Sequence, residues 1–93
     1  MNRLVLAAKL IEKSALRYTP AGVPALDLQL MHESTVSEDG QPRKVSMEIR
    51  AVGIGGITSR LQSVALGVPV EMAGFLAATR NGKGIVFHVT EVA

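Results

Sequence analysis

Aliphatic and polar residues alternate along much of the chain, and the alternation divides it into short segments. The first segment covers residues 2–10, and its aliphatic side consists of Leu4, Leu6, Ala8 and Leu10. A period of two residues indicates a strand with one buried face. The opposite side also carries Val5 and Ala7, so we expect that side to meet a further surface.

Two more strands are expected after a turn at residues 19–24, which contains two prolines and a glycine. The second strand alternates Leu26, Leu28 and Leu30 with Asp27 and Gln29. The third strand is expected from about Lys44 to Val52, and its predicted inner row is Val45, Met47, Ile49 and Ala51. Residues 34–44 are polar and contain Asp39-Gly40 and Pro42, so the sequence predicts a loop of roughly ten residues between these strands.

The second half of the chain predicts a helix and two further strands. Glycines at 53, 55 and 56 interrupt the alternation, and Ile57 to Leu66 has the spacing of a short amphipathic helix bounded by Gly56 and Gly67. Strands are expected at Val68–Ala78 and Ile85–Val92, joined at the turn signal Asn81-Gly82. The order predicts an all-β fold, a five-stranded Greek-key barrel with one short helix between strands three and four, which is the OB-fold. An open α+β sheet is the alternative. We expect residues 1–93 to form a single domain.

Composition favours a small intracellular protein with a subunit interface. The 93 residues are 47% hydrophobic, which is more apolar surface than a monomer of this size easily buries. The absence of cysteine excludes disulfides and is typical of the reducing cytoplasm. No apolar run reaches the ~18 residues of a membrane span, so no membrane association is expected.

The charge distribution indicates a polyanionic partner more clearly than the net charge of +2 does. In an OB-fold, the loop between strands one and two and the loop between strands four and five flank the ligand face. The first loop carries Lys13, Arg17 and Tyr18, the second carries Arg80 and Lys83, and Lys44 and Arg50 lie on the outer row of strand three. Each cation is a candidate phosphate ligand. The alternative for each is an ordinary solvated surface residue.

Other chemistry is not indicated. His32 and His88 lie in different predicted strands and lack metal-ligand spacing, so we expect no metal, no cofactor and no catalysis. The two phenylalanines, Phe75 and Phe87, fall in apolar strands, which leaves Tyr18 as the candidate for stacking a base. With so few aromatic residues, the expected DNA binding is weak and sensitive to salt.

Several segments resemble the PriB family (primosomal replication protein N), which is related to the single-stranded-DNA-binding proteins. They are Asn2-Arg3-Leu4-Val5-Leu6, residues 16–24, Leu30-Met31-His32-Glu33-Ser34, and Gly74-Phe75 followed by Arg80-Asn81-Gly82. The resemblance implies an OB-fold homodimer that binds single-stranded DNA, with Arg43 and Lys44 among its basic residues. It also implies a role in replication restart with the PriA helicase and, where it exists, DnaT. The alternative is an adaptor whose basic loops dock an acidic protein partner.

Overall fold

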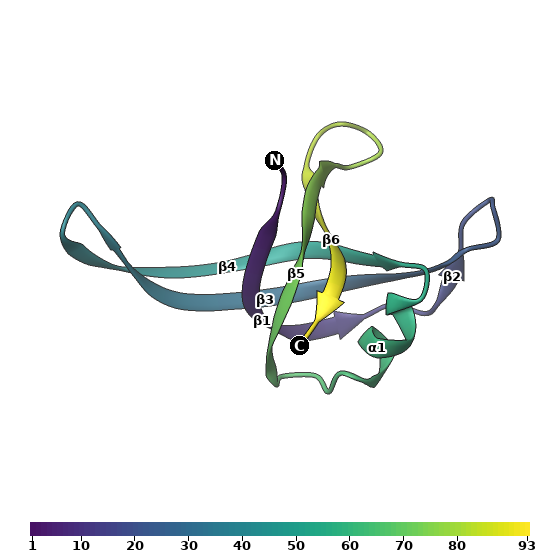
Figure 1. The fold of residues 1–93 in the computed structure, drawn as a ribbon, viewed down its shortest axis with the longest axis horizontal. Helices are drawn as coiled ribbons and strands as arrows, with labels where there is room; N and C mark the ends of the chain where they lie inside the picture. Colours follow the sequence, from purple (N-terminus) through teal and green to yellow (C-terminus); the bar gives the residue numbers. More distant parts are fainter.

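A computed structural model describes residues 1–93 and shows a closed barrel of five strands with one short helix (Figure 1). The strands are β1 (Leu4–Lys13), β2 (Arg17–Tyr18), β3 (Pro24–Glu38), β4 (Gln41–Ile54), β5 (Pro69–Ala78) and β6 (Ile85–Val92), and the helix is α1 (Ile57–Ser63). The barrel runs β1-β5-β6-β4-β3, and β1 closes it by pairing with β3. Strands β4 and β6 are parallel, and the other pairs are antiparallel. The predicted OB-fold is therefore confirmed.

The aliphatic rows of the first strands fill the barrel as the alternation predicts. Leu6, Ala8 and Leu10 of β1 are buried, and so are Leu26, Leu28 and Leu30 of β3. Phe87 of β6 lies at the centre with no exposed surface, packed among these residues together with Met72 and Leu61. A row of side chains that alternates with the core row consequently faces outward on each strand, and this outer row carries most of the polar residues.

The predicted loop at residues 34–44 is wrong, because this segment forms the outer half of a hairpin. Strands β3 and β4 pair without interruption from Ala25↔Ile54 to Glu38↔Gln41, and Asp39 and Gly40 alone form the turn. Their φ values of 52° and 73° are those of a type I′ turn, for which Asp-Gly is a favoured sequence. We call residues 34–45 the arm; it projects from the barrel on the left of Figure 1.

The arm also changes the predicted inner row of strand three. Ala51 is fully buried, but Ile49 is only partly buried and Met47 is 39% exposed. The reason is geometric: β4 leaves the barrel at about Met47, so its inner row continues beyond the space that the core fills. The molecule is correspondingly elongated, with extents of 49 × 30 × 21 Å.

Two smaller features differ from the sequence prediction. Helix α1 begins after Gly56 as expected but ends at Ser63, since Val64 already has extended backbone angles. The segment after β1 contains the two-residue strand β2, which pairs Arg17 with Ala25 and Tyr18 with Pro24. Strand β2 thereby holds this basic segment along the edge of β3.

Candidate nucleic-acid interface

Three hollows meet around Arg50 on the outer face of β3 and β4. One, of about 350 Å³, lies toward the β5–β6 loop; a second, of about 380 Å³, lies toward the end of β1; the third, of about 240 Å³, lies over β4 and β6. Arg50 lines all three. We call this connected surface the groove. It occupies the place between the two loops that an OB-fold uses for its ligand.

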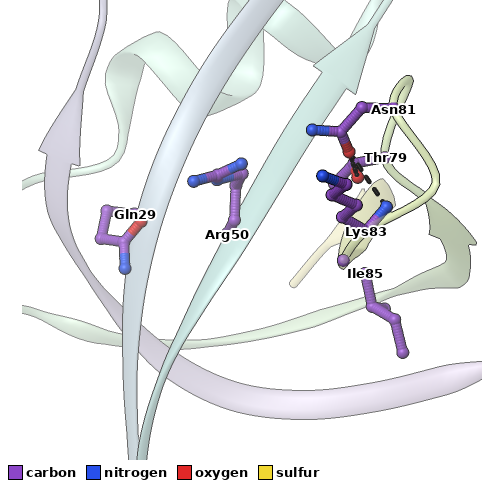
Figure 2. A pocket seen from close by; sticks show the side chains of 7 residues that line it. Gln29, Arg50, Thr79, Asn81, Lys83 and Ile85 are labelled. Atoms are coloured by element: carbon purple, nitrogen blue, oxygen red, sulfur yellow. Dashed lines mark hydrogen bonds between the residues drawn. The ribbon is translucent and has the colours of Figure 1, made fainter.

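The hollow beside the β5–β6 loop is lined mainly by polar residues (Figure 2). Arg50 of β4 lies opposite Gln29 of β3, and Lys83 and Asn81 approach from the loop. The Asn81 side-chain oxygen accepts hydrogen bonds from the Thr79 hydroxyl at 2.8 Å and from the Lys83 backbone N–H at 3.0 Å. These bonds fix the loop and leave the Asn81 amide N–H groups as donors, so the hollow is rich in donors suited to phosphate or base oxygens.

Arg50 is the strongest anion-binding candidate in the groove. None of the three ion pairs in the structure involves it, and it makes no side-chain hydrogen bond. Arg80 lines the neighbouring hollow and Lys83 lines the polar one. The structure therefore brings Arg50, Arg80 and Lys83 to one surface, as the OB-fold reading of the sequence expects.

Arg17 also lines the groove, but an acid occupies its guanidinium. Its Nε and Nη2 donate to the two carboxylate oxygens of Asp27 at 2.7 and 3.0 Å. This hydrogen bonding is the main reason that the pKa of Asp27 is lowered, with a smaller through-space contribution from Arg50. The same bond raises the pKa of Arg17. At neutral pH the pair is ionised, and Asp27 offsets part of the positive charge of the groove.

The remaining candidate residues lie outside the three hollows. The Lys13 ammonium donates to the backbone carbonyls of Gln62 and Val64, at 2.9 and 2.6 Å, where it caps the C-terminal end of α1. Tyr18 is 65% exposed on β2. Arg43 and Lys44 lie on the exposed arm, where Arg43 pairs with Glu38 at 3.0 Å.

Sequence reasoning did not single out the neutral residues of the groove. Gln29 was visible only as a polar position on the outer row of its strand, and Asn81 only as a turn signal. Their contribution depends on β3, β4 and the β5–β6 loop meeting, which a single sequence does not display. Asp27 was likewise an outer-row residue whose partner, Arg17, comes from another strand.

Comparison with known proteins agrees with the OB-fold described above. Residues 2–91 match the profile of a family described as "Another single-strand binding protein family". Over 81 residues the chain is 48% identical to the replication restart protein PriB of Bordetella pertussis, covering 87% of this chain and 76% of that protein. The chain belongs to the PriB group of the single-strand-binding family. PriB of Neisseria meningitidis serogroup B is 48% identical over 77 residues, covering 82% and 76% of the two chains.

Solved structures agree with this family assignment. PriB from Ralstonia solanacearum superposes with a TM-score of 0.91 at 39% identity, covering 100% of this chain and 96% of that one. The single-stranded DNA binding protein from Thermus aquaticus superposes at 0.75 with 23% identity, over 100% of this chain and 49% of that one, which shows a shared fold. In this PriB-family chain no helix is long and apolar enough to cross a membrane. No group of three potential metal ligands occurs.

Proposed function

We propose that the protein is a replication-restart factor that binds single-stranded DNA in the groove and has no catalytic activity. The observation that carries the proposal is Arg50, an unpaired guanidinium where three hollows meet, with Arg80 and Lys83 beside it. Guanidinium and ammonium groups bind phosphates along a strand, and such backbone contacts carry little sequence preference. The single-strand-binding family and its PriB members support this reading.

The family relationship extends the proposal to partners and setting. We infer a homodimer, built from one OB-fold domain of residues 1–93 per subunit, that acts in the cytoplasm. It would join the PriA helicase on single-stranded DNA and, where the organism has it, DnaT. Of the eight residues predicted to contact DNA, we place Arg50, Arg80 and Lys83 at the centre. Arg17, Tyr18, Arg43, Lys44 and Lys13 would contribute at the margins.

A titration tests the DNA-binding proposal directly. Dye-labelled oligo(dT) of about 30 nucleotides, enough for two OB-folds, would be followed by anisotropy at low and at physiological salt beside a duplex of equal length. We expect preference for the single strand and a salt slope that falls by about 0.7 in Arg50→Ala, the value of one single-strand phosphate contact. Arg60→Ala is the charge-matched control, since Arg60 lies on α1 outside the groove. Equal slopes in the two variants would remove Arg50 from the site.

One observation favours a protein-docking adaptor as the second candidate. Three of the predicted cations, Lys13, Arg17 and Arg43, have partners within the chain, so fewer positive groups are free for DNA than the sequence indicated. If the titration shows no single-strand preference, the adaptor becomes the better reading. Retention of PriA on the immobilised protein without DNA would then test it.

A further inference from the structure

Two aromatic rings stack against each other on the outside of the barrel. Phe75 of β5 and His88 of β6 are direct cross-strand partners. Their ring centroids lie 4.7 Å apart with an interplanar angle of 9°, which is the geometry of a stacked pair. Phe75 remains 38% exposed, and His88 makes no side-chain hydrogen bond. The pair is therefore an open aromatic surface, which we call the platform.

The platform adjoins the groove. Val52 of β4 is the partner of Asp27 on β3 and also of His88 on β6. One row of cross-strand partners therefore runs from Asp27 through the buried Val52 to His88 and Phe75. His88 lines the same hollow as Arg50, Arg17 and Arg80. A chain bound along these cations would thus reach the rings with its next base.

Core packing does not account for the platform. The aromatic residue that fills the barrel is Phe87, fully buried on the inner side of the same strand β6. Phe75 faces away from that core and leaves more than a third of its surface in water. An exposed aromatic surface beside a cationic groove is the combination that single-strand binders use.

We infer that Phe75 and His88 form a base-stacking surface for single-stranded DNA bound in the groove. This inference rests on the proposed function and assigns it a stacking site that the sequence placed elsewhere, at Tyr18. Stacking on a ring accepts any base, because every base presents a π face. The platform would therefore add affinity without adding sequence preference, and without adding a phosphate contact.

The test combines protein variants with an altered ligand. Phe75→Leu keeps an apolar side chain and removes the ring, and His88→Gln removes the second ring. Both would be titrated with oligo(dT) and with the same backbone carrying abasic sites, beside Tyr18→Leu, which removes the ring of the rival stacking site. We expect Phe75→Leu to weaken oligo(dT) binding by about 5- to 150-fold, the range for losing one stacked base, with an unchanged salt slope. On the abasic strand, Phe75→Leu and wild type should bind alike.

The outcomes separate the platform from the proposed function. If wild type binds oligo(dT) with a steep salt slope but no more tightly than Phe75→Leu does, the stacking role of the platform is overturned. DNA binding in the groove is then retained. Wild type that binds no single strand would overturn both. If Phe75→Leu is unfolded by circular dichroism, wild type would be cross-linked to an oligonucleotide containing 5-iodouracil and the adducts mapped by mass spectrometry. Adducts on Phe75 or His88 would support the inference, and adducts confined to Tyr18 would refute it.

Discussion

The pair formed by Arg17 and Asp27 shows how one contact changes the role of a residue. The pKa of the Asp27 carboxyl group is lowered, chiefly because Arg17 donates hydrogen bonds to it. A folded-state pKa below the unfolded value of about 3.9 stabilises the fold above that pH, and the stabilisation is lost as the pH falls through the lowered pKa. Since both side chains are about half exposed, at 51% and 47%, the contribution is under about 1 kcal/mol.

The larger consequence of this pair is for DNA binding. Asp27→Asn should tighten oligo(dT) binding several-fold and steepen its salt slope by about 0.7, because it releases Arg17 for one phosphate and removes a negative charge from the groove. Anisotropy at several salt concentrations measures both effects. Glu71→Gln, which removes a negative charge outside the groove, is the control and should leave the slope unchanged. A slope in Asp27→Asn no steeper than in Glu71→Gln would show that Arg17 does not reach the DNA.

At the scale of elements, the sequence predicts those whose packing imposes a clear period. The leucines of β1 and β3 lie in the barrel, and β6 has the predicted bounds, Ile85–Val92, because inner and outer residues differ in polarity. The arm lacks this contrast, since residues 35–44 are all exposed. Its strands are set by the Asp39-Gly40 turn and by continuation of the ladder from the barrel.

Pro42 explains why the sequence predicts a loop where the arm forms a hairpin. Proline has no N–H to give to a ladder, and so it usually marks the end of a strand. Antiparallel pairs alternate between hydrogen-bonded and non-hydrogen-bonded, and the pair next to a two-residue turn, Glu38↔Gln41, is of the first kind. The next pair, Ser37↔Pro42, is then non-hydrogen-bonded, and the missing N–H costs the ladder nothing.

The exposed arm should be removable without unfolding the barrel. Deleting residues 35–38 and 41–44 joins Ser34 through Asp39-Gly40 to Val45, and these two residues are already partners. The deletion shortens each strand by an even number of residues, so every remaining side chain keeps its face. We expect the melting temperature to change by only a few degrees, because no deleted residue is buried.

The same variant measures what the arm contributes to DNA binding. It removes Lys44, which has no partner in the chain, and the ion pair of Arg43 with Glu38. The salt slope should therefore fall by about 0.7 if Lys44 alone contacts a phosphate, and by about 1.4 if Arg43 exchanges Glu38 for DNA.

Deleting 36–38 and 41–43 instead shifts the turn to a non-hydrogen-bonded pair and should destabilise the hairpin. Equal melting of the two deletions would contradict the register argument.

At the scale of the whole molecule, the sequence predicts the loops that flank the candidate site but not the contacts within it. The OB-fold reading placed Arg80 and Lys83 beside the ligand face, and they line the groove with Arg50. It did not predict that Lys13 would cap α1, because Gln62 and Val64 lie 49 and 51 residues further along the chain. The sequence likewise did not predict the stacking of Phe75 on His88, because the two rings belong to different strands. Partners of this kind are set by the closed barrel rather than by local pattern.

The single chain leaves apolar surface that a second copy would cover. Only 17 of 93 residues are buried, while Val5 is 51% and Ile11 is 40% exposed on the outer side of β1. The root of the arm is adjacent: the His32 ring bonds the Ala7 carbonyl at 2.6 Å, and Met47 opposite His32 is 39% exposed. The outer side of β1 and the root of the arm thus carry exposed apolar side chains, interrupted on β1 by Lys9, and this agrees with the proposed homodimer.

A dimer formed through β1 would make stability depend on protein concentration. Because folding is then coupled to association, the melting temperature of wild type should rise with concentration, and sedimentation should give twice the 9.8 kDa chain mass. Val5→Arg places a charge on the proposed interface at a position exposed in the single chain, so it should yield a folded monomer of lower melting temperature that no longer depends on concentration. Leu66→Arg changes a residue of similar exposure, 57%, beyond α1 and should remain dimeric. Wild type that sediments as a monomer throughout would exclude the dimer, and a dimeric Val5→Arg would place the interface elsewhere than on β1.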